Sequence, residues 1–264
     1  MSQRTLWKEG LPWIIPLGIL TLWFAVSTTE AVPRYLLPHP IDVAKAANSY
    51  IFGHPGDQPY AGRFLDDLQS SLLRVMLGFA LAVIIGIPIG ILSGRLSLVS
   101  RLLGNTINAL RAVPGISWLP LAMVWFGIGI KTTVFLVALA AFFPVYLNTA
   151  TGARQINPRY YQAGAMMGVG RLRGIFAILL PSAMPHILAG LRLSMGIAWA
   201  YLVLGELTGV PNGLGAVIMD ARMLGRIDII MVGILMIAVV GRICDLLLYH
   251  GMRFCFKSAR RLHQ

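Results

Sequence analysis

The side chains able to perform chemistry are few, and they are scattered along the 264 residues of the chain. The five histidines have neither metal-ligand nor catalytic spacing: His39, His54, His186, His250 and His263. No His-Glu-x-x-His, Gly-x-Ser-x-Gly or Cys-x-x-Cys pattern occurs. The nearest match to a phosphate-binding loop, 127–132, lacks the glycine before Lys131 that lets backbone amides surround a phosphate. We therefore predict no catalytic, cofactor or metal site, and any ATPase that drives this protein would be another polypeptide.

Six charged side chains lie in or near long apolar stretches: Arg74, Arg111, Arg192, Glu206, Arg242 and Asp245. A charge in a membrane core costs several kcal/mol, so each of them needs water, a partner or a function. Arg242 and Asp245 are three residues apart on a helix, and we expect them to pair. Arg74 is near a predicted helix end, where its side chain is expected to snorkel to the interface.

Four residues are candidates for a solute path or its gate. Arg111 precedes the break Val113-Pro114-Gly115, and a Pro-Gly break at membrane depth is tolerated only beside protein or water. Arg192 falls in the first turns of a later helix, facing the loop that precedes it, and a structural ion pair is the alternative role for both arginines. Glu206 could pair with a basic group, cap the following loop or contact solute. The predicted path or gate residues are Arg111, Pro114, Arg192 and Glu206.

The composition places these residues in a membrane protein. Hydrophobic residues make up 57% of the chain and charged residues only 12%, whereas soluble proteins carry about 25% charged residues. The mean hydropathy is +0.74. The net charge of +12 is explained by basic cytoplasmic loops rather than by nucleic acid, since no basic stretch is interleaved with stacking aromatics.

The apolar stretches predict an all-α integral membrane protein, a single domain over 1–264, with about six transmembrane helices. We expect them near 12–27, 67–93, 102–128, 132–150, 182–206 and 228–251. The first is interpreted as an uncleaved helix rather than a signal peptide, because it lacks a small-residue cleavage site. A short interfacial helix is expected at 41–52, and 207–227 reads as a glycine-rich loop, re-entrant or not. Gly86, Gly90 and Gly94 predict close helix packing.

Basic residues fix the predicted orientation. Twelve fall on one side: Arg4, Lys8, Arg95, Arg101, Arg154, Arg159, Arg171, Arg173, Arg253, Lys257, Arg260 and Arg261. Six fall on the other: Arg34, Lys45, Arg63, Lys131, Arg222 and Arg226. The first side is therefore cytoplasmic, which places the N-terminal 1–11, the loop 151–174 and the basic tail 252–264 inside and the segment 30–66 outside.

The loop between the fourth and fifth predicted helices contains a short helix of its own. Asn157 suits an N-cap and Pro158 the first helical position, and the helix should run to about Met167. Gly168 and Gly170 then break it before a basic turn and a new helix. Two helices joined at a glycine hinge make a rigid projection that could fit a groove in a soluble partner.

This stretch resembles the coupling-loop motif of bacterial ABC importer permeases, which is Glu-Ala-Ala, three residues, Gly, nine residues and Ile-x-Leu-Pro. The chain has Gln162-Ala163-Gly164, then Gly168, then Ile178-Leu179-Leu180-Pro181. It departs from the motif at Gln162 in place of Glu and at Gly164 in place of Ala. The resemblance extends from Pro12 to about Arg260 and is strongest to the nitrate, sulfonate, taurine and bicarbonate group. Other similar stretches are 37–40, 110–114 and 125–129.

The resemblance implies a permease subunit in the bacterial inner membrane, embedded in lipid, that takes up a small anion such as a sulfonate, nitrate, bicarbonate or carboxylate. It implies a homodimer with two ATP-binding cassette ATPases, which bind ATP and Mg, and a periplasmic or lipid-anchored solute-binding protein. It also implies that the ATPase contacts the coupling loop through Arg159, Tyr161, Gln162, Ala163, Gly164, Met167, Gly168, Arg171 and Pro181. A secondary transporter or channel working without an ATPase is the alternative, although no convincing internal repeat supports it.

Overall fold

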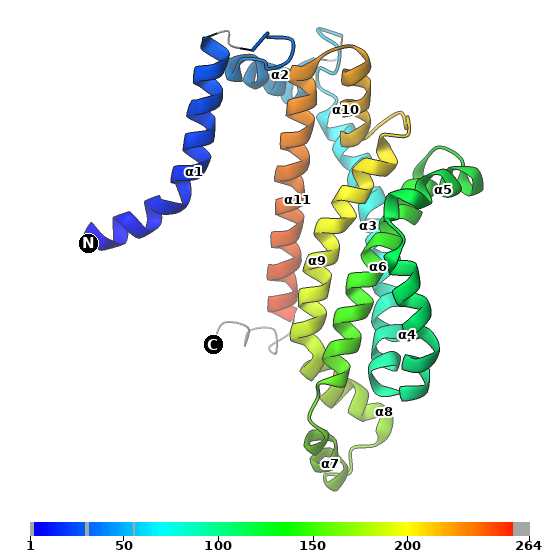
Figure 1. Cartoon of the computed structure of the whole chain (residues 1–264). Coiled ribbons are helices and arrows are strands. Elements are labelled where there is room, and N and C mark those ends of the chain that lie inside the picture. The colour runs from blue at the N-terminus through cyan, green and yellow to red at the C-terminus, as the bar shows by residue number, and fades with distance from the viewer. Residues whose placement is uncertain (1–2, 30–31, 55, 256–264) are drawn as a thin grey trace. The chain divides into compact units, whose positions relative to one another are not determined.

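The computed structural model describes residues 3–29, 32–54 and 56–255, and within them it is helical without β-strands (Figure 1). This confirms the all-α prediction. The chain divides into two compact units, 1–66 with 217–235 and 67–216 with 236–264. The predicted basic tail lies largely outside the described residues, as do Met1 and Ser2.

The first unit holds two complete helices, α1 (Gln3–Thr28) and α2 (Pro40–Phe52). The predicted short helix at 41–52 is thus confirmed. His39 caps α2, since its Nδ1 accepts a hydrogen bond from the Ile41 amide at 3.3 Å. The Trp23 indole N–H of α1 donates to the Pro38 carbonyl at 3.1 Å, so the residues that start α2 are held against α1.

Most of the remaining helices belong to the second unit. They are α3 (Phe64–Arg95), α4 (Ser97–Ala112), the 3-10 turn η1 (Gly115–Trp118), α5 (Leu119–Phe126), α6 (Ile130–Arg154), α7 (Pro158–Met166), α8 (Arg171–Gly174), the π-helical turn η2 (Ile175–Leu179) and α9 (Leu180–Glu206). α10 (Leu214–Met223) and α11 (Ile227–Cys255) have residues in both units.

Four helical segments among the described residues are long and apolar enough to cross a membrane: 64–95, 130–154, 175–206 and 227–252. A fifth is counted if α4 and the following η1–α5 form one bent span, while the apolar part of α1, Ile14–Thr28, is shorter. The prediction of about six spans is therefore confirmed for four helices, and the other two remain predictions.

Helix α6 packs closely against α3 because glycines remove the side chains between them. A Cβ added to Gly90 would lie 2.8 Å from the Thr149 Cβ, and one added to Gly94 would lie 2.7 Å from the Ala153 Cβ. Gly86 approaches Val145 in the same way. These three glycines thus serve the close packing that the sequence predicts.

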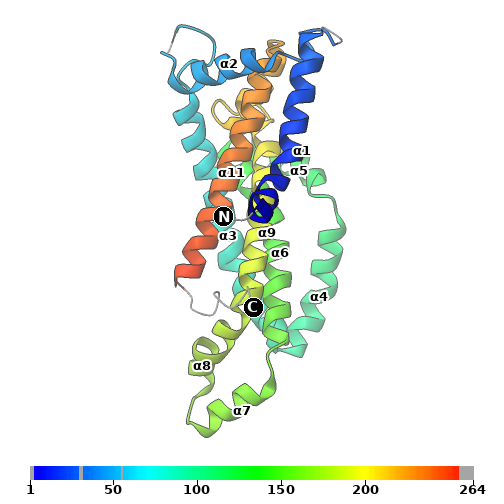
Figure 2. The same cartoon turned by 90° about the vertical axis from the view of Figure 1, so that its left-hand side faces the viewer.

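Helix α6 is also packed against α9, and the two lie side by side in both views (Figure 2). Gly190 of α9 faces Asn148, and Gly152 of α6 faces His186; an added Cβ at either glycine would lie 2.7 Å from its neighbour's Cβ. Helix α6 therefore forms the centre of this unit and positions the residues on both its sides.

The predicted helix at 102–128 is interrupted where expected. Val113 is extended, with φ −73° and ψ 120°, as the residue before a proline prefers. Helix α4 and the η1–α5 segment consequently meet at 90°. Ile107 is the one buried residue of α4, so this helix leaves most of its surface uncovered in a single copy of the chain.

The helix containing α9 starts earlier than predicted. Helices α8 and η2 lead into it without a break, so the helical path begins at Arg171 rather than near Ser182. The widened turn of η2 directly precedes Pro181. A proline cannot donate to the carbonyl four residues back and its ring clashes with it, and a π-helical turn gives that carbonyl room.

The segment 207–227 is not a loop throughout, because it contains α10. Two of its glycines, Gly213 and Gly215, are required by close contacts with Glu206. A Cβ on Gly213 would lie 2.5 Å from the Glu206 Oε1, and one on Gly215 would lie 2.9 Å from the Glu206 Cβ. The glycines that predicted a loop at 213 and 215 thus make room for a carboxylate.

Candidate functional site

Helix α7 begins as its sequence predicts. The Asn157 Oδ1 accepts a hydrogen bond from the Arg159 amide at 3.0 Å, and Pro158 occupies the first helical position. An N-cap of this kind stabilises a helix by about 1 kcal/mol. Isolated helices of this length are marginal in water, so such local support decides whether α7 forms.

The end of α7 is closed by a paired set of backbone hydrogen bonds. Gly168 is left-handed, with φ 74°, a conformation that costs about 1–2 kcal/mol for residues bearing a Cβ. Its amide donates to the Ala165 carbonyl at 3.0 Å, and the Val169 amide donates to the Gly164 carbonyl at 2.9 Å. These two bonds form the glycine-based C-terminal motif of helices and turn the chain sharply toward α8.

Two contacts join α7 to the rest of the second unit. A Cβ added to Gly164 would lie 2.5 Å from the Ile178 Cδ1, so the glycine lets α7 approach η2 closely. The Arg95 guanidinium, at the end of α3, lies 4.0 Å from the centre of the Tyr161 ring. Burial raises the pKa of the Tyr161 phenol, and nearby Arg95 opposes that shift. Helix α7 is thus held by both α3 and the start of α9.

The far side of α7 is uncovered and partly apolar. Met166 and Met167 are 86% and 76% exposed, and Tyr160 is exposed beside them. Gln162 and Ala163 are also exposed. Helices α7 and α8 extend beyond the ends of α6 and α9 (Figure 1). We call α7 with the turn to Val169 the knob. Methionine side chains at such a surface adapt readily to a partner.

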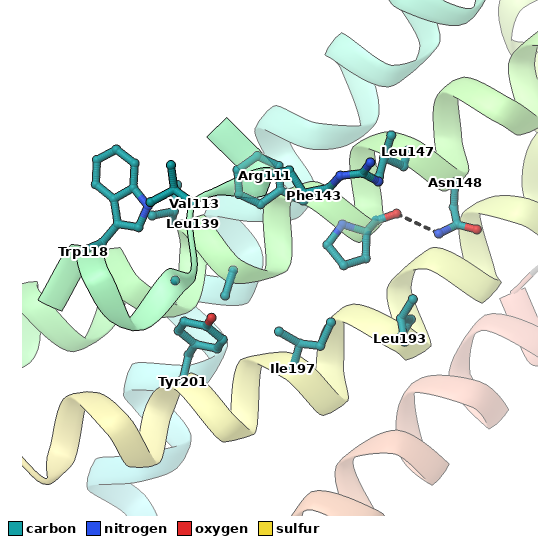
Figure 3. A pocket seen from close by; sticks show the side chains of 13 residues that line it. Arg111, Val113, Trp118, Leu139, Phe143, Leu147, Asn148, Leu193, Ile197 and Tyr201 are labelled. Carbon is teal, nitrogen blue, oxygen red and sulfur yellow. Dashed lines mark hydrogen bonds between the residues drawn. The ribbon is translucent and has the colours of Figure 1, made fainter. Parts of the chain in front are cut away.

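A cavity of ≈ 340 Å³ lies within the second unit, between η1 with the end of α4, α6 and α9. Its lining includes Arg111, Trp118, Phe143, Asn148, Ile197 and Tyr201. Figure 3 shows Tyr201 and Ile197 pointing into it from α9, while the Arg111 side chain extends toward Leu147 and Asn148. The Asn148 amide donates to the Pro144 carbonyl at 2.9 Å, which reinforces the turn that contains the proline.

Gly115 lets the bent segment approach α9. An added Cβ would run into the Tyr201 ring, so any other residue at 115 would require η1 or the Tyr201 side chain to shift. The cavity is therefore shaped by a residue pair far apart in sequence. Its lining is aromatic and aliphatic apart from Arg111, Asn148 and the Tyr201 hydroxyl, which is typical of small-molecule sites.

A buried polar group, which we call the α3–α9 cluster, consists of Asp67, Ser71, Arg74 and Glu206. The Arg74 Nη1 donates to the Glu206 Oε1 at 2.6 Å, and the Ser71 hydroxyl donates to the same oxygen at 2.8 Å. The Gly215 amide donates to the other oxygen at 2.8 Å. The prediction that Arg74 snorkels is wrong, because its side chain is only 9% exposed and is paired with Glu206 of α9.

A second group, the α9–α11 cluster, consists of Arg192, Arg242 and Asp245. The Arg192 Nε and Nη2 donate to the two oxygens of Asp245, both at 3.0 Å, and the Arg242 Nη1 donates at 3.1 Å. The predicted Arg242–Asp245 pair is thus confirmed. Arg192 lies well inside α9 and points at α11, not at the preceding loop.

The predicted path residues do not gather at one place. Arg111 lines the cavity, and Pro114 lies between the lining residues Val113 and Gly115. Arg192 and Glu206 belong to the two clusters. Sequence reasoning missed Asn148 and Tyr201, since a single polar group on an apolar helix carries no sign of what it faces. The side chain of Arg171 is outside the described set, and the described residues hold no group of three or more metal-ligating side chains.

The chain is similar to known transport proteins over most of its length. The family described as "Binding-protein-dependent transport system inner membrane component" matches residues 86–253. A protein named as an aliphatic sulfonates transport permease, SsuC of Bacillus subtilis, is 35% identical over 92% of this chain and 84% of its own length. The taurine transport system permease TauC of Escherichia coli is 32% identical over 93% and 90%. The nitrate import permease NrtB of Synechocystis is 29% identical over 86% and 82%.

The fold also has a counterpart among solved structures. An inward-facing structure of the MetNI methionine ABC transporter matches with a TM-score of 0.56, over 70% of this chain and 95% of the other. The sequences are only 16% identical, so this likeness concerns the fold alone.

Proposed function

Because the chain belongs to the family of binding-protein-dependent transport system inner membrane components, we propose that it moves a small anionic solute inward, driven by a separate ATPase acting on the knob. The chain is a permease subunit of an ABC importer, and an ATPase and a solute-binding protein are its implied partners. The observation that carries the proposed coupling is the knob itself. It is a short helix closed at both ends, held by Arg95 and Ile178, with its methionines exposed.

The knob transmits force because it is rigid and joins two long helices. It lies between α6 and α9, so a shift of the partner ATPase tilts both helices as one body. The proposed coupling residues are Arg159, Gln162, Ala163, Met167, Gly168 and Arg171. Tyr161 and Gly164 hold α7 against Arg95 and Ile178. Pro181 sets the widened turn at the base of α9. The solute contributes only its differential affinity for the two resulting states. ATP and Mg stay with the partner ATPase.

The solute passes the cavity at Arg111 and Pro114. Among the described residues that line the cavity, Arg111 is the one cationic side chain, which favours an anion. Relatives are named for sulfonates, taurine and nitrate. A carboxylate or bicarbonate has the same charge. Arg192 and Glu206 influence the path through α9, to which both belong, rather than by touching the solute.

A second copy of the chain completes the path, with one ATPase bound to each copy. The bent segment supports this proposal, because its apolar side chains are exposed in a single copy: Leu98, Leu102, Ile116, Val124, Trp125, Phe126 and Ile128. The excess of basic residues places both termini and the knob in the cytoplasm of a bacterial cell. The segment 30–66 then faces the solute-binding protein, free or lipid-anchored.

The test uses the assembled complex in nanodiscs, with its ATPase and the ligand-loaded binding protein. Met167→Glu places a charge on the exposed knob without touching its core, and Met167→Leu keeps the apolar surface as the matched control. We expect Met167→Glu to lower ATPase retention by about 30-fold, as for a residue at the centre of an interface, and Met167→Leu to leave it unchanged.

Stimulated ATP hydrolysis should fall in parallel. Equal ATPase retention in both variants would refute the coupling surface. Solute uptake by the permease alone in liposomes would refute the ATP-driven importer and favour a secondary transporter.

A further inference from the structure

A second cavity, of ≈ 420 Å³, lies between α9 and α11 and contains the α9–α11 cluster. Its lining includes the apolar residues Pro185, Leu188 and Leu246. It also includes the two arginines with Tyr249 and His250. The cavity is distinct from that at Arg111, and the proposed transport path does not use it.

The charges of this cluster do not balance. Two guanidinium groups face one carboxylate, and Arg192 already occupies both oxygens of Asp245 with a bidentate pair. Arg242 shares one of those oxygens through a single nitrogen, and its side chain is 65% exposed. Because a guanidinium has five N–H donors, most of those of Arg242 remain for another acceptor. Among the described residues of the cluster, one positive charge is therefore left over inside a membrane-spanning segment.

The depth of the cluster suits a lipid headgroup. The apolar segment of α11, Ile227–Met252, has 26 residues. At about 1.5 Å per residue it exceeds a hydrocarbon core of about 30 Å, so its ends reach the polar interface. Tyr249 is three residues from Met252, where interfacial aromatics occur, and Arg192 lies 4.9 Å from the centre of its ring. Arg242 lies seven residues, about 10 Å along the helix, deeper than Tyr249. Its long side chain can extend toward the interface from there.

We propose that the cavity between α9 and α11 binds an anionic phospholipid of the cytoplasmic leaflet, with the phosphate on Arg242 and an acyl chain along Pro185 and Leu246. Planar guanidinium groups bind phosphate through paired, charge-assisted hydrogen bonds. The cytoplasmic leaflet supplies anionic headgroups, and basic pockets between helices on that side bind them. The leaflet assignment rests on the topology given under the proposed function.

The experiment measures phosphatidylglycerol retained by the assembled permease–ATPase complex after delipidation, by native mass spectrometry, with phosphatidylcholine as the neutral probe. Arg242→Gln removes the surplus charge but leaves the Arg192–Asp245 pair intact. Lys131→Gln makes the same change of net charge outside this cavity. We expect Arg242→Gln to weaken phosphatidylglycerol binding about tenfold, as for loss of a charged hydrogen bond. Lys131→Gln should have no effect.

Asp245→Asn separates a lipid site from a structural ion pair. It removes the competing carboxylate, so phosphatidylglycerol binding should be retained or strengthened, whereas a merely structural cluster would lose lipid on either substitution. Equal retention by wild type and Arg242→Gln would overturn the proposal. Retention of inorganic phosphate without any preference for phosphatidylglycerol over phosphatidylcholine would also overturn it, since the site would then hold only free anion.

The lipid-binding measurement does not depend on transport activity. ATP hydrolysis stimulated by the binding protein is measured on the same samples. Loss of that stimulation in the wild type, with lipid selectivity intact, would count against the importer function and not against the lipid site.

Discussion

The α3–α9 cluster and the α9–α11 cluster are two solutions to the same problem, an arginine within a membrane-spanning helix. In the first, the Arg74 and Glu206 side chains are 9% and 0% exposed and form an ion pair, while buried Asp67 accepts a hydrogen bond from the Gly213 amide. In the second, Arg192 and Arg242 are 41% and 65% exposed and share Asp245, which is 19% exposed. The first cluster has its ion pair buried between helices of the chain, whereas the second has an exposed guanidinium with donors left for a ligand.

The hydrogen bonds of the buried Glu206 carboxylate connect separate segments of the chain. Its carboxylate accepts hydrogen bonds from α3 through Ser71 and Arg74, and from the start of α10 through Gly215. The Gly213 amide donates to Asp67 at 2.9 Å, which adds a second link between that segment and α3. The buried cluster therefore holds three segments together, and removing one partner strands charged groups away from water.

The largest expected effect comes from breaking the buried pair. Arg74→Leu leaves Glu206 charged and without its cation, and should lower the free energy of unfolding by about 3–5 kcal/mol. Arg242→Leu, the matched change in the exposed cluster, should cost less than about 1 kcal/mol. Unfolding in detergent micelles measures both.

If Arg74→Leu abolishes folding, adding Glu206→Gln should recover part of the stability, because the stranded charge is then removed. Equal losses for Arg74→Leu and Arg242→Leu would show that burial does not separate the clusters.

A smaller effect is expected at the glycines beside Glu206. Gly213 and Gly209 both have positive φ, 139° and 97°. A Cβ added to Gly213 would lie 2.5 Å from the Glu206 Oε1, whereas a Cβ added to Gly209 would have no described atom within 4 Å. Gly209→Ala should cost about 1 kcal/mol from backbone strain alone. Gly213→Ala adds a steric clash of about 1–3 kcal/mol. Similar thermal stability of the two variants would mean that the segment can move away from Glu206.

The smallest effect concerns salt. Wild type should exceed Arg192→Gln in stability by about 1 kcal/mol at most, since the pair is partly exposed. Raising the salt from 0.1 to 1 M shortens the screening length from about 10 to about 3 Å, so this difference should shrink. The difference between wild type and Arg74→Leu should stay constant. Unfolding curves measured at both salt concentrations test this. A salt-dependent difference in stability between wild type and Arg74→Leu would contradict the burial of the Arg74–Glu206 pair.

Some features of both fold and site follow from neighbouring residues and were therefore predictable. Asn157 and Pro158 mark the start of the knob and Gly168 its end, because helix caps depend on a few adjacent backbone groups. The Arg242–Asp245 pair follows from the three-residue spacing on one helix. The Val113–Pro114 break was equally clear, since proline restricts the residue before it.

What the sequence alone determined is this local set, together with the membrane class and the motif of the coupling loop. Only the tertiary structure decided that Arg74 meets Glu206, 132 residues away, that Arg192 faces Asp245, and that Tyr201 packs on Gly115. The physical reason is that an apolar helix presents the same pattern whichever neighbour it packs against. Close packing at glycines and pairing of charged side chains select the helix faces of α3, α9 and α11 that make contacts. Both require the assembled helices.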